Sequence, residues 1–370
     1  MTTPLGRRIA ARIAAEGPIA LDAYMAACLF DPEGGYYTTL PVFGGAGDFI
    51  TAPEISQMFG ELIGLALGQV WRDQGAPGRI TLAELGPGRG VLMADLWRAA
   101  GKVAGFQAAA DLWLIEASPR LAAIQAERLA HAAPRFATDA AALPEGPLYL
   151  IANEFFDALP VRQFLRTPEG WAETVVGLGP DGALQPGRVP VAAGLPRAIA
   201  RRTATTPPGT VLEHCPAAPA IMAEIAGRIA RHGGAAIVID YGGWDGQGDT
   251  LQAIARHRPT DPFAAPGTAD LTAHVDFAPL AAAARAAGAE ASGPVAQGAF
   301  LGRLGIGLRA EVLARGLAGA SLAAHRAATA RLTDPSEMGT LFKVLAIHPR
   351  GTPPPPGLTP DDAAEEGPRA

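Results

Sequence analysis

The sequence predicts an α/β fold built on a doubly wound, mostly parallel sheet. One observation is the apolar run Ile80–Leu85, which ends in glycines at alternate positions and continues into a helix pattern. A second is the repeated alternation of strand and helix patterns, which is typical of parallel sheets joined by helical crossovers. The third is size, because 370 residues, 49% of them apolar, can form one large domain with insertions or two domains.

The chain before this first strand predicts an N-terminal helical segment, residues 1–75. Two short helices, at 6–15 and 21–29, precede a turn and a glycine-rich loop at 44–51. Pro53 begins the next helix, which keeps an apolar side to about residue 73. A loop of this length and composition must either pack closely on something or move.

The rest of the chain predicts the sheet domain, residues 76–348, and a disordered tail, residues 349–370. Further strand patterns occur at 111–116, 136–138, 147–153, 235–240 and 342–347, and helix patterns at 92–100, 119–131, 219–232, 277–287 and much of 300–332. The last strand is expected at an antiparallel edge. Residues of about 161–213 hold short strand patterns joined by Gly, Pro and Asp turns, which predicts a β-rich insertion.

Composition excludes several classes of function. The net charge is −6 and no basic block stands out, so sequence-independent nucleic-acid binding is not expected. No run of about 18 apolar residues predicts insertion into a membrane. Cys28 and Cys215 are isolated, which indicates a reducing compartment and excludes a cysteine-built metal site. Because the start of the chain has no long apolar stretch typical of a signal peptide, we expect a cytoplasmic protein. The composition looks bacterial, and we expect no bound metal.

The glycine turn predicts a nucleotide-like ligand. Gly86, Gly88 and Gly90 follow Glu84 in the pattern E-x-G-x-G-x-G, and the next strand ends in Glu116. A dinucleotide site favours G-x-G-x-x-G, and a P-loop is excluded because no G-K-[ST] follows. The combination suits S-adenosylmethionine better, with Glu116 accepting hydrogen bonds from the ribose. The alternatives are a tight turn without a ligand and a solvated acid at the strand end.

The carboxyl end of the fourth strand carries Asn153, Glu154 and Asp157. In doubly wound sheets, ligands lie outside the carboxyl ends of strands, near the switch in strand order. Two acids three residues apart behind a buried strand call for a positive partner, and a substrate guanidinium or ammonium would serve. Such a grip would orient a nitrogen toward a methyl donor and accept its proton. The alternative is that Asp157 caps a turn and Glu154 pairs with Arg162.

A later cluster, Asp270 to Asp276, places His274 between acids. His274 is a candidate for a general base or for a metal ligand. The alternative is that the two acids hold loop and helix caps, which we favour for Asp276.

These motifs resemble one family, the MidA-like class I methyltransferases, which include a mitochondrial complex I assembly factor that methylates arginine. The most specific stretch is Asn153–Pro160, Asn-Glu-Phe-Phe-Asp-Ala-Leu-Pro. Other matching stretches span nearly the whole chain in the family's order: 34–37, 47–56, 84–90, 239–242, 270–277 and 338–344. The resemblance implies a seven-stranded, Rossmann-like methyltransferase domain with N-terminal helices and a β insertion.

We therefore expect methyl transfer from S-adenosylmethionine to a protein arginine, with a respiratory complex I subunit as one possible acceptor. Gly86, Gly88 and Gly90 would cradle the cofactor, Glu116 would hold its ribose, and Glu84 would orient the turn or meet the methionine amine. The loop's glycines and the resemblance suggest that Asp48, Thr51 and Ser56 close over the cofactor. The alternatives are a non-catalytic assembly factor that binds the cofactor and a small-molecule methyltransferase. A homodimer is one possible state.

Overall fold

A computed structural model describes residues 3–39, 51–191 and 194–362. The chain forms two units, and each is built from separate stretches of sequence. The parallel-sheet unit combines residues 50–156, 220–242 and 280–370, and the antiparallel unit combines residues 1–49, 157–219 and 243–279.

The parallel-sheet unit contains seven strands of one sheet in the order β15–β16–β10–β5–β2–β3–β4. Their bounds are β2 (Ile80–Leu85), β3 (Ala110–Ile115), β4 (Arg135–Ala137), β5 (Leu148–Asn153), β10 (Gly234–Gly243), β15 (Ala289–Ala296) and β16 (Phe342–Pro349). The five strands from β10 to β4 are parallel, whereas β16 and β15 run antiparallel to their neighbours. Strand order reverses at β2, which lies between β3 and β5, so the sheet is doubly wound as predicted.

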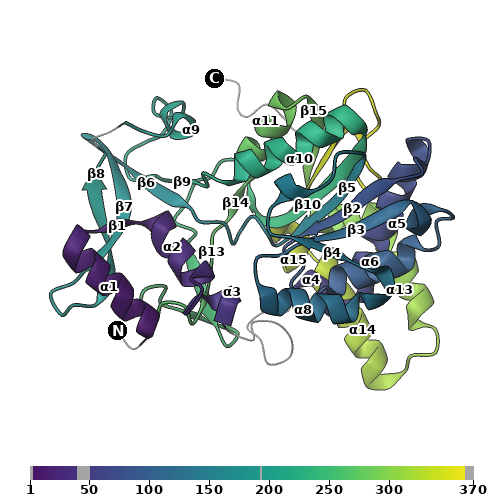
Figure 1. Ribbon diagram of the computed structural model, residues 1–370, viewed down its shortest axis with the longest axis horizontal. Helices are drawn as coiled ribbons and strands as arrows, with labels where there is room; N and C mark the ends of the chain where they lie inside the picture. Colours follow the sequence, from purple (N-terminus) through teal and green to yellow (C-terminus); the bar gives the residue numbers. More distant parts are fainter. Residues whose placement is uncertain (1–2, 40–50, 192–193, 363–370) are drawn as a thin grey trace. The chain divides into compact units, whose positions relative to one another are not determined.

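Helices cover both faces of this sheet (Figure 1). The helices α5 (Gln57–Asp73), α6 (Val91–Ala100) and α8 (Pro119–Arg128) lie on one side and α10 (Ala218–His232) on the other. The remaining helical segments are α4 (Ala52–Ile55), α7 (Phe106–Ala109), α11 (Phe277–Ala286), α12 (Gln297–Arg303), α13 (Ile306–Ala314), α14 (Gly319–Thr333), α15 (Met338–Leu341), η1 (Ala130–Ala132), η2 (Ala140–Ala142) and η3 (Pro360–Asp362). The core between α5, α6 and the sheet is apolar, with Phe59, Leu96 and Ile151 fully buried. Apolar runs such as β2 and β5 form strands here because both of their faces are covered.

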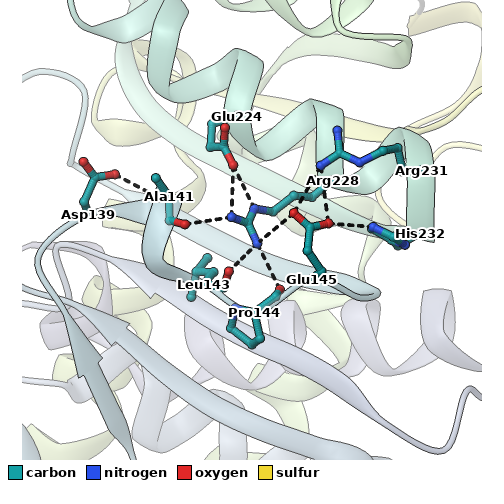
Figure 2. A network of polar contacts seen from close by, with 9 residues as sticks. All are labelled: Asp139, Ala141, Leu143, Pro144, Glu145, Glu224, Arg228, Arg231 and His232. Atoms are coloured by element: carbon teal, nitrogen blue, oxygen red, sulfur yellow. Dashed lines mark hydrogen bonds and ion pairs between the residues drawn. The ribbon is translucent and has the colours of Figure 1, made fainter.

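A buried arginine binds the segment that precedes β5. Arg228, on α10, binds the carbonyl oxygens of Ala141, Leu143 and Pro144 and the carboxylate of Glu224 (Figure 2). Its side chain is only 5% exposed, so these partners replace the water that the guanidinium loses. This network lies at the edge of the sheet opposite to the glycine turn.

The antiparallel unit contains a five-stranded sheet and a three-stranded sheet. The first consists of β1 (Ile19–Ala20), β6 (Arg162–Thr167), β7 (Gly170–Leu178), β8 (Leu184–Pro190) and β9 (Val211–His214), and the second of β11 (Gln252–Ala255), β12 (Arg258–Thr260) and β13 (Asp270–Thr272). Helices α1 (Pro4–Glu16) and α2 (Leu21–Phe30) supply much of its core, with Leu21 and Met25 fully buried. The unit also holds α3 (Tyr36–Thr39), α9 (Arg197–Ala200) and β14 (Val275–Asp276).

Several local features differ from the expected elements. β16 is antiparallel as expected but lies inside the sheet rather than at its edge, because β15, which is not among the expected strands, forms that edge. The helix expected from Pro53 is interrupted at Ser56, whose backbone is extended with φ of −158° and whose Oγ caps α5. The segment after β10, where no strand pattern is expected, contains the three-stranded sheet. Residues 349–362, expected in the tail, include η3, and Asp362 binds Arg303 (Oδ2 to Nη1, 2.6 Å). Residues 363–370 lie outside the described residues.

Candidate functional site

The glycine turn connects β2 to α6 at the carboxyl edge of the parallel sheet. Gly86, Gly88 and Gly90 have φ of +58°, +55° and +72°, a region that other residues rarely adopt. A Cβ on Gly86 would lie 3.0 Å from Cδ2 of Phe155, so this position also lacks space. The turn therefore exposes bare backbone next to the first turn of α6, where helix N–H groups are available to a ligand.

Glu84 is a buried acid two residues before the turn. It is 3% exposed, and its ladder neighbours are Leu114 on β3 and Ile151 on β5. Burial raises the pKa of its carboxyl to about 8, and the nearby charge of Glu116 adds to this rise. Among the described residues, Oε2 of Glu84 has no hydrogen-bond partner.

Glu116 follows β3 directly and is held at both carboxylate oxygens. Oε1 accepts from the N–H of Ser118 (2.7 Å), and Oε2 accepts from Nε2 of Gln125 (2.9 Å). Burial raises the pKa of Glu116, and these hydrogen bonds oppose the rise. Because each oxygen has more than one lone pair, ribose hydroxyls can still donate to this carboxylate.

The sequence interpretation missed Gln125, a residue of α8. Its side chain is fully buried, and Nε2 also donates to the carbonyl oxygen of Gly88 (2.8 Å). One carboxamide thus joins the glycine turn to Glu116. No sequence signal distinguishes this glutamine from a solvent-facing one in an amphipathic helix.

Asn153 and Glu154 lie where β5 ends. Nδ2 of Asn153 donates to Oε1 of Glu154 (3.0 Å), and the same oxygen accepts from the N–H of Ala52 (3.3 Å). Glu154 has φ of +50°, which is strained for a residue with a Cβ. Such strain is common where a side chain must be aimed at a ligand. Arg162, considered above as a partner for Glu154, forms an ion pair with Glu173 (Nε to Oε1, 2.7 Å).

The short helix α4 links two of these strand ends. Its first residue, Ala52, binds Glu154 at the end of β5. Glu54, in the same turn, forms an ion pair with Arg89 in the glycine turn (Oε1 to Nη1, 3.3 Å). Arg89 is a second residue that the sequence interpretation did not single out.

The expected covering residues flank this helix. Thr51 stands at the N-cap position of α4 and makes no side-chain cap hydrogen bond. Ser56 caps α5 by accepting from the N–H of Met58 (3.3 Å). Asp48 lies outside the described residues. The assignment of these three residues to cofactor binding stays a prediction.

Asp157 belongs to the antiparallel unit, as does the partly buried Tyr37. The hydroxyl of Tyr37 donates to both carboxylate oxygens of Asp270 (2.9 Å each). Burial raises the pKa of Tyr37, and the charges of Asp270 and Asp157 raise it further. The carbonyl oxygen of Asp157 accepts from the N–H of Ala273 (3.0 Å), which ties it to the segment after β13.

His274 is exposed in the same unit, and its N–H donates to Oγ1 of Thr250 (2.8 Å). Its neighbour Asp276 accepts from the N–H of Ala278 at the start of α11 (3.1 Å), which agrees with a helix cap. Burial raises the pKa of Asp276 to about 6. Within the described ranges, no group of three His, Cys, Asp or Glu residues could hold a metal ion.

The parallel-sheet unit thus brings together most of the expected site residues: Glu84, Gly86, Gly88, Gly90, Glu116, Asn153, Glu154, Thr51 and Ser56. The buried atoms Glu84 Oε2, Gln125 Oε1 and Asn153 Oδ1 have no protein partner in the described part of the chain. The two amide oxygens are acceptors, and so is the Glu84 carboxyl once it is ionised. S-adenosylmethionine carries the complementary donors, an amino group and ribose hydroxyls, and a Cβ on Gly86 would crowd the turn. The residues present therefore fit this cofactor.

Comparisons with known proteins identify the family of the chain. The sequence profile of an S-adenosyl-L-methionine-dependent methyltransferase family matches residues 62–295. The mouse protein named "Protein arginine methyltransferase NDUFAF7, mitochondrial" is 37% identical, over 94% of this chain and 85% of its own length. The corresponding Drosophila melanogaster homologue is 36% identical, over 93% of this chain and 85% of its own length.

A solved structure shows the same fold. It is a crystal structure of a Burkholderia thailandensis protein, described as a methyl transferase candidate, bound to S-adenosyl-homocysteine. It superposes with a TM-score of 0.81 at 32% identity, covering 93% of this chain and 91% of the other.

No helix in the described part of the chain is long and apolar enough to span a membrane. With the family profile, the relatives and the fold in agreement, the resemblance predicted from the motifs is confirmed, and the chain belongs to the MidA-like family of S-adenosylmethionine-dependent methyltransferases.

Proposed function

We propose that this methyltransferase modifies an arginine nitrogen of a protein. The observation that carries the proposal is the identity of 36–37% over nearly the whole chain to relatives named protein arginine methyltransferase. The carboxylate of Glu154 supports it, because a carboxylate at the end of β5 suits a planar guanidinium, which it can bind through two parallel hydrogen bonds.

The chain's own residues would act mainly by positioning. The glycine turn and Glu116 hold the cofactor, which supplies an electrophilic methyl group on a sulfonium. Asn153 and Ala52 fix the Glu154 carboxylate, so it can orient the guanidinium before the reaction. As the new N–C bond forms and the S–C bond breaks, the guanidinium nitrogen must lose a proton, and a carboxylate can accept it.

We assign supporting roles to two residues of the antiparallel unit. Asp157 is a second carboxylate for the methyl acceptor. His274 is a candidate general base because the residue is exposed to solvent. Substitution to Asp157→Asn or His274→Gln should lower methyl transfer without changing the affinity for S-adenosyl-homocysteine. Loss of cofactor affinity in either variant would contradict these roles.

The test is transfer of labelled methyl groups from S-adenosylmethionine to proteins of a cell lysate. Wild type should label protein arginine, while Gly88→Val should not bind the cofactor and Glu154→Gln should bind it without transfer. Glu145→Gln is the matched control, since Glu145 is an exposed acid before the amino end of β5. Labelled product that is small rather than protein would overturn the arginine proposal.

We further propose a respiratory complex I subunit as the first acceptor to test, because the MidA-like family includes a complex I assembly factor. A bacterial cytoplasmic location and a homodimer are also proposals, and the curated relatives are named as mitochondrial. Light scattering of the purified protein tests the dimer. Mass spectrometry of proteins that lose methylation on deletion of the gene tests the acceptor.

A further inference from the structure

Gln125 makes the contact that joins the two halves of the cofactor site. Its Nε2 donates to the carbonyl oxygen of Gly88 (2.8 Å) and to Oε2 of Glu116 (2.9 Å). Its side chain is completely buried. These two partners come from the ends of different strands, β2 and β3.

The orientation of this carboxamide is determined by its partners. Both the Gly88 carbonyl and the Glu116 carboxylate are acceptors, so only the NH₂ group of Gln125 can face them. A flipped amide would place its oxygen against two other oxygens. In the described part of the chain Oε1 has no partner, so no competing hydrogen bond favours the flip.

The glycine turn needs such an external support. Gly88 lies between two other glycines with positive φ, and glycine has the largest conformational freedom of all residues. A buried donor on its carbonyl limits this freedom and fixes which way the neighbouring N–H groups point. The same donor fixes Glu116, whose other oxygen is held by Ser118.

We propose that Gln125 is a positioning residue for S-adenosylmethionine, which sets the spacing between the glycine turn and the ribose-binding carboxylate. This inference rests on the assignment of Glu116 to the ribose. Gln125 acts through Gly88 and Glu116 and need not touch the cofactor itself.

Calorimetry with S-adenosyl-homocysteine tests the proposal. We expect Gln125→Met to raise Kd about tenfold, because a hydrogen bond to a charged group is lost from a buried site. The isosteric Gln125→Glu also removes the donors and faces Glu116 with like charge, so Kd should rise at least as much. Gln107→Met is the matched control: Nε2 of Gln107 donates to the carbonyl oxygen of Trp97 (2.7 Å), and this variant should leave Kd unchanged.

A double-mutant cycle separates positioning from a general loss of stability. If Gln125 acts through both partners, Gln125→Met should raise Kd by a smaller factor when Glu116→Gln is already present, because only the contact with the Gly88 carbonyl then still depends on the donor. An equal rise in both backgrounds, or an equal rise for Gln125→Met and Gln107→Met, would overturn the inference. Wild-type protein that binds no S-adenosyl-homocysteine would instead overturn the cofactor assignment, which keeps the two failures distinct.

Discussion

Replacing Glu84 with glutamine should abolish a proton release that accompanies cofactor binding. Burial raises the pKa of Glu84 to about 8, so about nine-tenths of this carboxyl is protonated at pH 7. If the carboxyl meets the cationic amine of the methionine moiety, binding favours its ionised form. Wild type should then release up to about 0.9 proton per cofactor bound at pH 7, and Glu84→Gln should release none from this site.

Calorimetry in buffers of different ionisation enthalpy measures the number of protons released. It is the slope of a plot of the observed binding enthalpy against the ionisation enthalpy of the buffer. The difference between the two slopes removes the contribution of all other groups. Equal slopes would refute the contact with the amine and leave Glu84 only the role of orienting the turn. Because its folded-state pKa is raised, Glu84 favours folding below its ordinary pKa, and this stability is lost as pH rises toward 8. This loss should be absent in Glu84→Gln.

Three further predictions concern stability and activity. Arg228→Met should lower the free energy of unfolding by about 3 kcal/mol in urea titrations, because buried carbonyls lose a charged donor. The exposed Arg231→Met should change it by less than about 0.5 kcal/mol, and equal effects would contradict the buried role of Arg228. Gly86→Ala should lower the free energy of unfolding by about 1–2 kcal/mol and weaken cofactor binding, because φ is +58° and Phe155 lies 3.0 Å from the added Cβ. Unchanged cofactor affinity would contradict a role of the turn in holding the cofactor. Glu154→Gly should relieve the backbone strain at φ +50°, so its melting temperature should equal or exceed that of Glu154→Ala. It should also lose methyl transfer, and retained transfer would exclude Glu154 as the residue that binds the methyl acceptor.

Most strands of the parallel-sheet unit could be predicted closely because they are short apolar runs, whereas β15, which contains Glu290, Gly293 and Pro294, was not predicted. Ile80–Leu85 is buried along its whole length, which favours apolar side chains, and the buried acid Glu84 is the exception within it. The break at Ser56 could not be predicted in this way. The apolar side of the helix continues across it, and only the extended backbone of Ser56 shows where α5 begins.

Two kinds of signal in the sequence point to the candidate site: glycines that backbone geometry demands, and polar residues at the carboxyl ends of strands, such as Glu116 and Asn153. Positive φ at Gly86, Gly88 and Gly90 requires glycine, so the turn is visible as a pattern. Gln125 and Arg89 act through side-chain contacts with residues distant in the sequence, Gly88 and Glu54. The residues next to them in the chain do not indicate these contacts, so they could not be predicted. The left-handed backbone of Glu154 is likewise imposed by its surroundings, because the residue type itself disfavours it.

The strand order also has a consequence for synthesis of the chain. β16 pairs with β10 along Ala236–Tyr241, although about a hundred residues separate them in the sequence. At typical rates of translation, β10 therefore leaves the ribosome roughly 5–20 s before its partner. During this interval the edge of an apolar strand has unpaired N–H and C=O groups and can pair with another nascent chain. Slow arrival of β16, rather than low final stability, should thus limit the yield of folded protein when expression is strong.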